Sequence, residues 1–95
     1  MSQYEGIFIF KPDLEEKELE QEYSKIEDAI NKHEGKVEKS EKWGKKRLAY
    51  EIKKSRDGFF LYVDFKAMPK SIGPLTKFLK LNNNILRTQI VRKEK

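Results

Sequence analysis

The hydrophobic positions of the chain fall into six segments that alternate between strand and helix spacing. Residues 4–10 form a short apolar run rich in β-forming residues, which predicts a strand covered on much of both faces. Residues 14–33 carry hydrophobic side chains at intervals of three and four, which predicts an amphipathic helix. The positions on its buried stripe are Leu19, Tyr23, Ile26 and Ile30.

The ends of this first helix are predicted from local signals. Asp13 and Glu16 have the spacing of a capping box, and Gly35 can adopt the left-handed conformation that ends a helix. His33 falls in the last turn, so we expect a helix-end residue and not a metal ligand or a base. The outer face is acidic and is expected to be solvated, because its carboxylates do not converge; they are Glu15, Glu16, Glu18, Glu20 and Glu22.

Two long strands follow and are predicted to form a hairpin. Residues 37–52 alternate apolar and polar positions in their second half, and their polar first half is typical of an edge strand. Gly44 within this segment predicts a β-bulge or a close backbone approach. Residues 53–58 are polar and end in Asp-Gly, which predicts the turn. The strand over 59–66 has one apolar face with Leu61, Val63 and Phe65, and a second face with Phe60, Tyr62 and Asp64.

A second helix and a last strand complete the pattern. Ser71 is the expected cap of the helix, and Pro74 is expected in its first turn. Three asparagines at 82–84 end the helix, and residues 85–91 predict a strand. The helix buries Ile72, Leu75 and Leu79, whereas the strand places Arg87 and Gln89 opposite Leu86, Thr88 and Ile90.

This order of elements predicts an α+β fold, the ferredoxin-like βαββαβ sandwich, as a single domain over residues 1–95. Both helices should cover one face of a four-stranded antiparallel sheet, with the first and third strands in its centre. The other face should remain uncovered by this chain. That face is expected to carry some of Phe60, Tyr62, Arg47, Arg87 and Gln89.

Composition narrows the possible functions. The chain has no cysteine and one histidine, which excludes disulfides, thiolate metal sites and thiol redox chemistry. No apolar run reaches the roughly 20 residues of a membrane span, and we expect no signal peptide and a cytoplasmic location. Residues 1–34 have a net charge of −6 and residues 35–95 a net charge of +11. A basic half of this kind favours an anionic polymer as partner, although a solvated or heat-adapted surface is the alternative.

The basic residues cluster in the segment that starts at Trp43. Lys45, Lys46 and Arg47 follow the tryptophan, and further cations occupy the turn at 53–56, a mixture that favours nucleic acid. The alternative is a charged strand edge that protects against aggregation. An RNA recognition motif is not expected, because residues 57–63 place Phe60 where that motif requires a small residue.

The whole chain resembles the family of bacterial small-subunit ribosomal proteins numbered six. The resemblance depends on Tyr4-Glu5, Lys11-Pro12-Asp13, Gly35-Lys36-Val37, Leu81 to Arg87 and, above all, Trp43-Gly44-Lys45-Lys46-Arg47-Leu48-Ala49-Tyr50-Glu51-Ile52. It implies a structural, non-catalytic protein that binds small-subunit ribosomal RNA in the central domain, as a heterodimer with ribosomal protein eighteen of the same subunit. It implies no cofactor, no metal, no membrane and no small-molecule substrate.

Applied to the matching positions of this sequence, the resemblance implies which residues contact RNA or the partner protein. They are Lys45, Lys46, Arg47, Tyr50 and Arg87, with Arg56 and Arg92 added from their charge and position. Tyr50 could instead be a core aromatic, and Trp43 could pack over the sheet edge. Two other functions remain as alternatives. An acylphosphatase-type enzyme would need an arginine in the loop at 11–13, which has none. A protein-interaction or ligand-sensing module would use the sheet without RNA.

Overall fold

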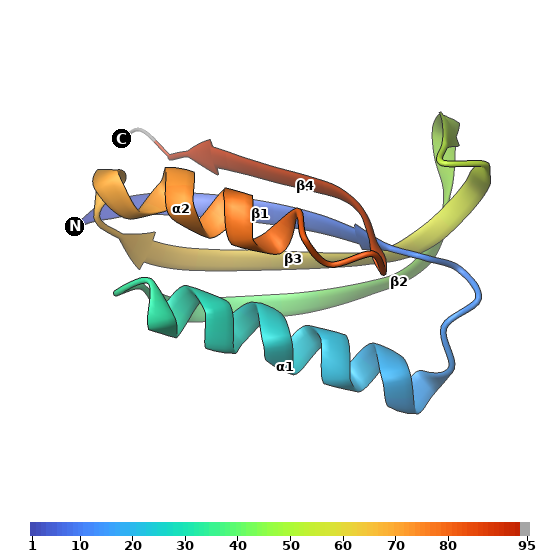
Figure 1. Cartoon of the computed structure of the whole chain (residues 1–95), viewed down its shortest axis with the longest axis horizontal. Coiled ribbons are helices and arrows are strands. Elements are labelled where there is room, and N and C mark those ends of the chain that lie inside the picture. The colour runs from blue at the N-terminus through green and yellow to red at the C-terminus, as the bar shows by residue number, and fades with distance from the viewer. Residues whose placement is uncertain (94–95) are drawn as a thin grey trace.

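The computed structural model describes residues 1–93, which form six elements in the predicted order (Figure 1). Strand β1 and helix α1 come first, the hairpin of β2 and β3 follows, and α2 and β4 close the fold. The elements are β1 (Ser2–Phe10), α1 (Glu16–Lys32), β2 (Lys36–Ile52), β3 (Ser55–Ala67), α2 (Pro69–Leu79) and β4 (Ile85–Arg92).

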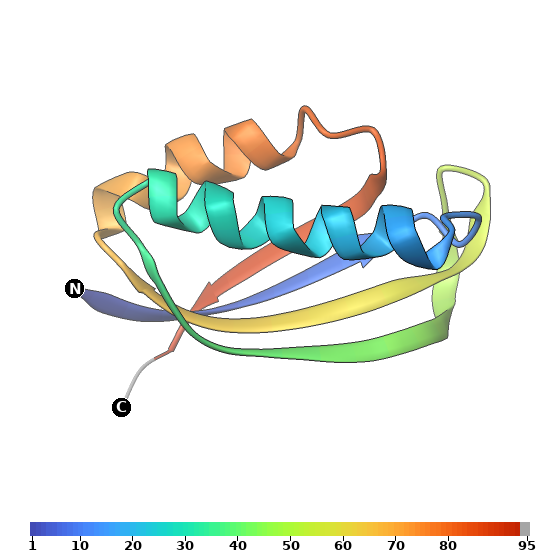
Figure 2. The same cartoon turned by 90° about the horizontal axis from the view of Figure 1, so that it is seen from below.

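The four strands form one antiparallel sheet in the order β2-β3-β1-β4, so the two most apolar strands are central, as predicted. Figure 2 shows both helices on the same face of the sheet. This confirms the ferredoxin-like sandwich. It also leaves β2 and β4 as the two sheet edges, each with a row of backbone groups that no strand of residues 1–93 pairs.

The core lies between the sheet and the helices. The predicted stripe of α1 is buried throughout, and it packs against the buried faces of β1 and β3. Seven large side chains have less than 2% of their surface exposed, namely Phe8, Phe10, Phe65, Ile26, Ile30, Leu75 and Val63. Burial of each such side chain is worth about 1.5–3 kcal/mol, and β3 alone contributes Leu61, Val63 and Phe65 in strict alternation.

Two predictions about the ends of α1 were wrong. The helix begins after Glu15, whose backbone N–H donates to the Glu18 carboxylate at 3.1 Å, so the capping pair is not Asp13 with Glu16. At the other end Glu34, not Gly35, has the left-handed φ of 64°. Gly35 is required for a different reason, because a Cβ there would lie 2.9 Å from the backbone oxygen of Ile30.

Two further boundaries differ from the prediction. Helix α2 begins after Met68 with Pro69 in its first turn, so Ser71 is not the cap and Pro74 lies inside the helix. The hairpin turn consists of two residues, Lys53 and Lys54, which separate the paired residues Ile52 and Ser55. Asp57 and Gly58 therefore belong to β3 and do not form the turn.

Candidate nucleic-acid interface

A bulge at Gly44 changes which side chains of β2 face the helices. The register with β3 shifts between Lys42 and Gly44, and Gly44 has a φ of 80° with no heavy atom near its missing Cβ. Before the shift, the Lys42 ammonium lies on the helix side, 2.8 Å from the Glu20 carboxylate. Within the shift, the Trp43 ring stacks on Tyr62 on the opposite face, with ring centroids 5.2 Å apart. After it, Lys45 is paired with Phe59, which packs against the helix-side core.

The basic triplet Lys45, Lys46 and Arg47 follows the bulge directly. All three side chains are exposed, and within residues 1–93 none lies within ion-pair distance of a carboxylate. The Lys45 ammonium lies 5.5 Å from the centre of the Phe59 ring, and that of Lys46 lies 5.1 Å from the Trp43 ring. Aromatic faces thus hold these cations without neutralising their charge.

The triplet does not form a flat patch. Lys45 is paired with Phe59, which packs against the helix-side core, and Lys46 is paired with Gly58. Consecutive strand residues point to opposite faces of the sheet. The positive charge therefore surrounds the β2 edge, a shape that can contact phosphates on either side of the edge.

The end of the hairpin covers part of the face that was expected to be open. Residues Leu48, Tyr50 and Ile52 line a concavity of about 230 Å³ together with open-face residues of the other three strands, among them Ile7, Phe60 and Arg87. Stacking of Trp43 on Tyr62 covers a second part of that face. The prediction of a face uncovered by this chain was therefore wrong at these two places, and at both of them the register of β2 with β3 shifts, between Lys42 and Gly44 and between Arg47 and Ile52.

Tyr50 and Trp43 each had two interpretations, and their exposure and contacts show where each side chain lies, while contact with RNA or a partner stays a prediction. Tyr50 is 63% exposed, so it is not a core aromatic, and its hydroxyl accepts a hydrogen bond from Arg87 Nη1 at 2.9 Å. Trp43 is 38% exposed and packs over the sheet edge through its stack on Tyr62. Trp43 also donates from Nε1 to the Glu41 carboxylate, which fixes the ring.

Near the chain termini, the charges of the open face are paired with one another. The Asp64 carboxylate accepts from the Tyr62 hydroxyl at 2.8 Å and lies 2.9 Å from Lys93 Nζ. Burial raises the pKa of Asp64, but the hydrogen bonds from Lys93 and Tyr62 outweigh it, and the pKa lies below its usual value. Lys39 and Glu41 form another pair at 2.8 Å. Lys39, Lys66 and Lys93 are thus in ion pairs, whereas Lys45, Lys46 and Arg47 at the hairpin end are not in any within residues 1–93.

The structure brings six of the seven predicted contact residues to the hairpin end of the sheet. Arg56 lies near the turn, opposite the last part of β2, and Arg87 joins the group through Tyr50. Arg92 does not join it, because it is paired with Tyr4 at the other end of β1.

A buried carboxylate was missed by sequence reasoning. Glu22, predicted to be solvated, is 3% exposed and accepts hydrogen bonds from the side-chain amides of Asn82 and Asn84 and from Lys25. Burial raises the pKa of Glu22, but these donors outweigh it and lower the pKa overall. The contact ties α1 to the segment directly before β4, the strand that carries Arg87. The run of three asparagines was the sequence signal for it.

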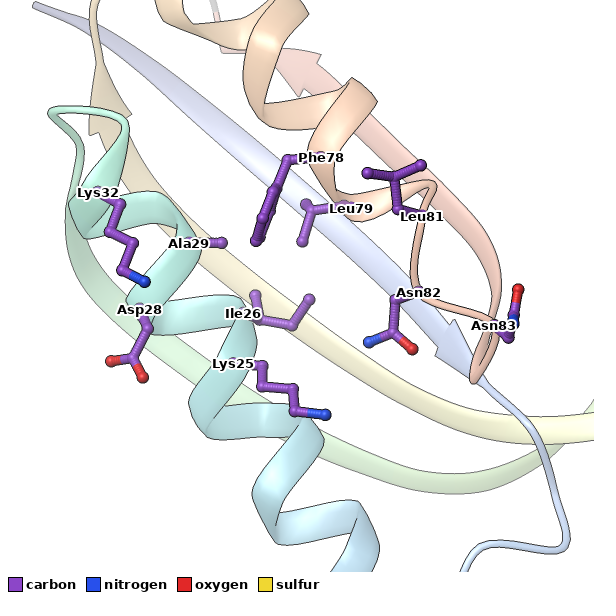
Figure 3. A pocket seen from close by; sticks show the side chains of 10 residues that line it. All are labelled: Lys25, Ile26, Asp28, Ala29, Lys32, Phe78, Leu79, Leu81, Asn82 and Asn83. Carbon is purple, nitrogen blue, oxygen red and sulfur yellow. The ribbon is translucent and has the colours of Figure 1, made fainter.

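The groove between the two helices has a different character (Figure 3). It has a volume of about 430 Å³, and Ile26, Ala29, Leu79 and the exposed side chains of Phe78 and Leu81 give it apolar walls. Figure 3 shows the Phe78 ring between the helices. Its charged residues, Lys25, Asp28 and Lys32, lie at the rim and include both signs. This groove does not have the features of a phosphate site.

Residues 1–93 offer neither a metal site nor a membrane span. No group of three or more histidine, cysteine, aspartate or glutamate side chains in that part of the chain could hold a metal ion. None of its helices is both long and apolar enough to cross a membrane.

The chain is similar in sequence and in fold to known proteins. The family model for ribosomal protein S6 matches residues 3–92. The chain is similar to the small ribosomal subunit protein bS6 of Mycobacterium bovis (39% identity over 95 residues, covering 100% of this chain and 99% of that protein). It is also similar to the protein of the same name from Desulforamulus reducens (37% identity over 92 residues, 97% of both). The crystal structure of 30S ribosomal protein S6 from Thermotoga maritima superposes with a TM-score of 0.91 at 30% identity, covering 97% of this chain and 87% of that one.

Proposed function

The chain belongs to the ribosomal protein S6 family, and we propose that it binds the central domain of small-subunit ribosomal RNA together with ribosomal protein eighteen of that subunit. The family consists of non-catalytic structural proteins of the small ribosomal subunit, so the chain is a component of the ribosome in the cytoplasm. An enzyme of the acylphosphatase type is thereby set aside. The RNA contact, the partner protein and the contact residues are the proposal.

The observation that supports RNA binding is the uncompensated positive charge at the hairpin end. Lys45 and Lys46 rest on aromatic rings, and Arg87 is held by a neutral hydroxyl, so all three are oriented while their charge remains available. Orienting a long cationic side chain before binding reduces the entropy that binding costs. Each cation that neutralises a phosphate also releases a counterion, which favours association at low salt.

The remaining part of the open face supports a protein partner. Between the hairpin end and β4, the concavity is lined by Ile7, Ile9 and Phe60, with Gln89 beside them. An apolar floor with a few polar groups is typical of the centre of a protein interface. A partner seated there would lie next to the basic residues, so protein and RNA could share one continuous surface. Specificity would then come from RNA shape and from the joint surface, because phosphate contacts carry little sequence information.

The experiment that tests this function measures binding of a central-domain ribosomal RNA fragment, with and without ribosomal protein eighteen. Replacing Lys45, Lys46 and Arg47 by Ala should weaken RNA binding roughly tenfold at about 0.1 M salt for each phosphate that the variant no longer neutralises. The thermal midpoint should hardly change, because the three side chains are exposed.

A matched control removes three cations from the opposite end of the molecule. Lys32 ends α1, Lys36 begins β2 and Lys70 lies in the first turn of α2, and all are exposed. Replacing these three by Ala should leave RNA affinity nearly unchanged. Equal reductions of affinity in both triple variants would show that overall charge, and not this surface, drives binding. Binding of the partner protein combined with no RNA binding, either by the chain alone or by the pair, would favour the interaction-module alternative.

A further inference from the structure

Three cations from three different elements meet along the outer edge of β4. Lys53 lies in the hairpin turn, Lys80 directly follows α2 as its C-cap, and Arg87 is on β4. They line one concavity of about 390 Å³ with Ile85, Leu86 and Thr88, and no acidic residue lines it. Figures 1 and 2 both place the hairpin tip and the segment from α2 to β4 at the same end of the molecule.

The charges in this concavity are not neutralised within residues 1–93. None of the three cations is in an ion pair there, and the hydrogen bond of Arg87 is to the neutral Tyr50 hydroxyl. The floor is apolar, because Ile85 and Leu86 are buried. The Thr88 hydroxyl is buried without a hydrogen-bond partner in that part of the chain. Cations above a low-dielectric floor attract an anion more strongly than the same cations in open water.

The backbone of the turn gives a second, independent observation. Lys53 and Lys54 have φ of 48° and 67°, the left-handed region that favours Asn and Gly in a two-residue hairpin turn. Lysine has no conformational advantage there and is less stable than Asn or Gly in this conformation. Backbone strain at a residue whose side chain lines a concavity, as at Lys53, points to a role for that side chain in binding.

We propose that Lys53, Lys80 and Arg87 form a second phosphate-binding site, which holds the sugar-phosphate backbone of RNA along the β4 edge, separate from the contact at Lys45–Arg47. This inference depends on the RNA binding proposed above and adds to it. The first contact lies at the β2 edge and the second at the β4 edge, at the same end of the sheet. An RNA strand bound to both passes around the hairpin, and no base needs to be recognised.

The test uses two substitutions that preserve the fold. In Lys53→Asn, the asparagine readily adopts the left-handed backbone conformation of this position. In Lys80→Gln, the glutamine keeps most of the length of the lysine side chain at the end of α2. The doubly substituted protein is measured for affinity to the central-domain RNA fragment with ribosomal protein eighteen present. Removing one phosphate contact should lower affinity roughly tenfold at about 0.1 M salt and reduce the slope of log K against log salt by about 1. The thermal midpoint should stay equal or rise.

Two controls make the result decisive. Lys54→Asn removes one charge from the same turn and relieves the same strain, but Lys54 does not line the concavity, so its effect on affinity should be smaller than that of Lys53→Asn. Lys36→Gln removes a charge at the far end of β2 and should leave affinity unchanged. The second site does not exist if Lys53→Asn lowers RNA affinity no more than Lys54→Asn does, and if the variant with both Lys53→Asn and Lys80→Gln retains wild-type RNA affinity. If wild-type protein fails to bind the RNA at all, the proposed function itself is wrong.

Discussion

Arg87 donates a hydrogen bond from Nη1 to the hydroxyl of Tyr50 at 2.9 Å, which joins β4 to the end of β2 across the open face of the sheet. The two strands are at opposite edges of the sheet, so this contact connects edges that are separated by β3 and β1. The link gives the Arg87 guanidinium a fixed position and leaves its charge unpaired within residues 1–93. The same arginine borders both the apolar concavity of the open face and the cationic concavity at the β4 edge.

The first prediction concerns this hydrogen bond. Tyr50→Phe removes the acceptor and keeps the ring, so the free energy of unfolding should change by no more than about 0.5 kcal/mol, as for most surface substitutions. RNA affinity should fall about two- to tenfold, because Arg87 must then be ordered on binding. The slope of affinity against salt should not change, since no charge is removed. Chemical denaturation and RNA titration measure the two quantities.

Arg87→Ala is the matched comparison for this prediction. It removes the charge as well as the hydrogen bond, so the salt slope should fall by about 1. A Tyr50→Phe variant that is destabilised by more than about 1 kcal/mol, well beyond the usual range for an exposed side chain, would mean that the hydroxyl serves the fold and does not orient Arg87 for binding.

The arrangement of the elements could be predicted from the sequence because burial repeats with the period of each element. Leu61, Val63 and Phe65 alternate along β3, and Leu19 and Ile30 mark the two ends of the buried stripe of α1. The turns and caps could not be predicted as well. Gly58 resembled a turn glycine, but it lies in β3 where a Cβ would come 2.7 Å from the Phe10 backbone oxygen. The sequence alone does not distinguish a glycine that is required for close packing from one that is required for a turn.

The candidate site could be predicted in its charges but not in its shape. A run of three cations suggested a patch, whereas strand alternation places Lys45 and Lys46 on opposite faces. The contact of Tyr50 with Arg87 joins residues 37 positions apart, and no local pattern signals it. Glu22 was assigned to a solvated face because its partners, Asn82 and Asn84, lie 60 and 62 positions further along the chain.

The second prediction is the salt dependence of the wild-type protein. Eight cations at the hairpin end and the β4 edge lack carboxylate partners within residues 1–93, namely Lys45, Lys46, Arg47, Lys53, Lys54, Arg56, Lys80 and Arg87. If about four of them contact phosphates, affinity should fall roughly 50- to 150-fold between about 50 and 200 mM salt, at a slope of about −0.7 to −0.9 for each phosphate. Filter binding across this range measures the slope. An affinity that is independent of salt would identify a mainly apolar, protein-only interface.

The third prediction tests the bulge that positions the basic triplet. Gly44→Ala should destabilise the fold by about 1–2 kcal/mol, because its φ of 80° disfavours any side chain even though the space around it is open. Gly44→Asn should destabilise the fold less than Gly44→Ala, since asparagine adopts this backbone conformation more readily than alanine. The stack of Trp43 on Tyr62 should be disturbed more in the Ala variant than in the Asn variant, and tryptophan fluorescence measures this disturbance. Equal effects of Ala and Asn would mean that side-chain crowding, and not φ, limits this position.

The fourth prediction concerns the buried carboxylate of Glu22. Burial raises its pKa, the hydrogen bonds from Asn84, Asn82 and Lys25 lower it more, and the folded pKa lies below the usual value of 4.5. A group whose pKa is lower in the folded state binds more protons when unfolded, so its stabilisation is complete above the unfolded pKa. That contribution should diminish as the pH falls below about 4.5 and through the folded pKa. Urea denaturation at a series of pH values from about 7 to about 3 measures the change.

Glu22→Gln separates this carboxylate from the other acidic groups of the chain. Glutamine keeps one acceptor oxygen for Asn82 or Asn84 but cannot ionise, so the variant should be less stable by about 1.5–3 kcal/mol at about pH 7, the worth of a hydrogen bond to a charged group. Its stability should then decline less than that of the wild-type protein between about pH 5 and pH 3. Glu27→Gln, an exposed substitution on the same helix, should leave both the stability and its pH dependence as in the wild type. If Glu22→Gln and the wild-type protein are destabilised in parallel on acidification, the carboxylate is not ionised in the fold, and the Asn82 and Asn84 amides hold a neutral acid.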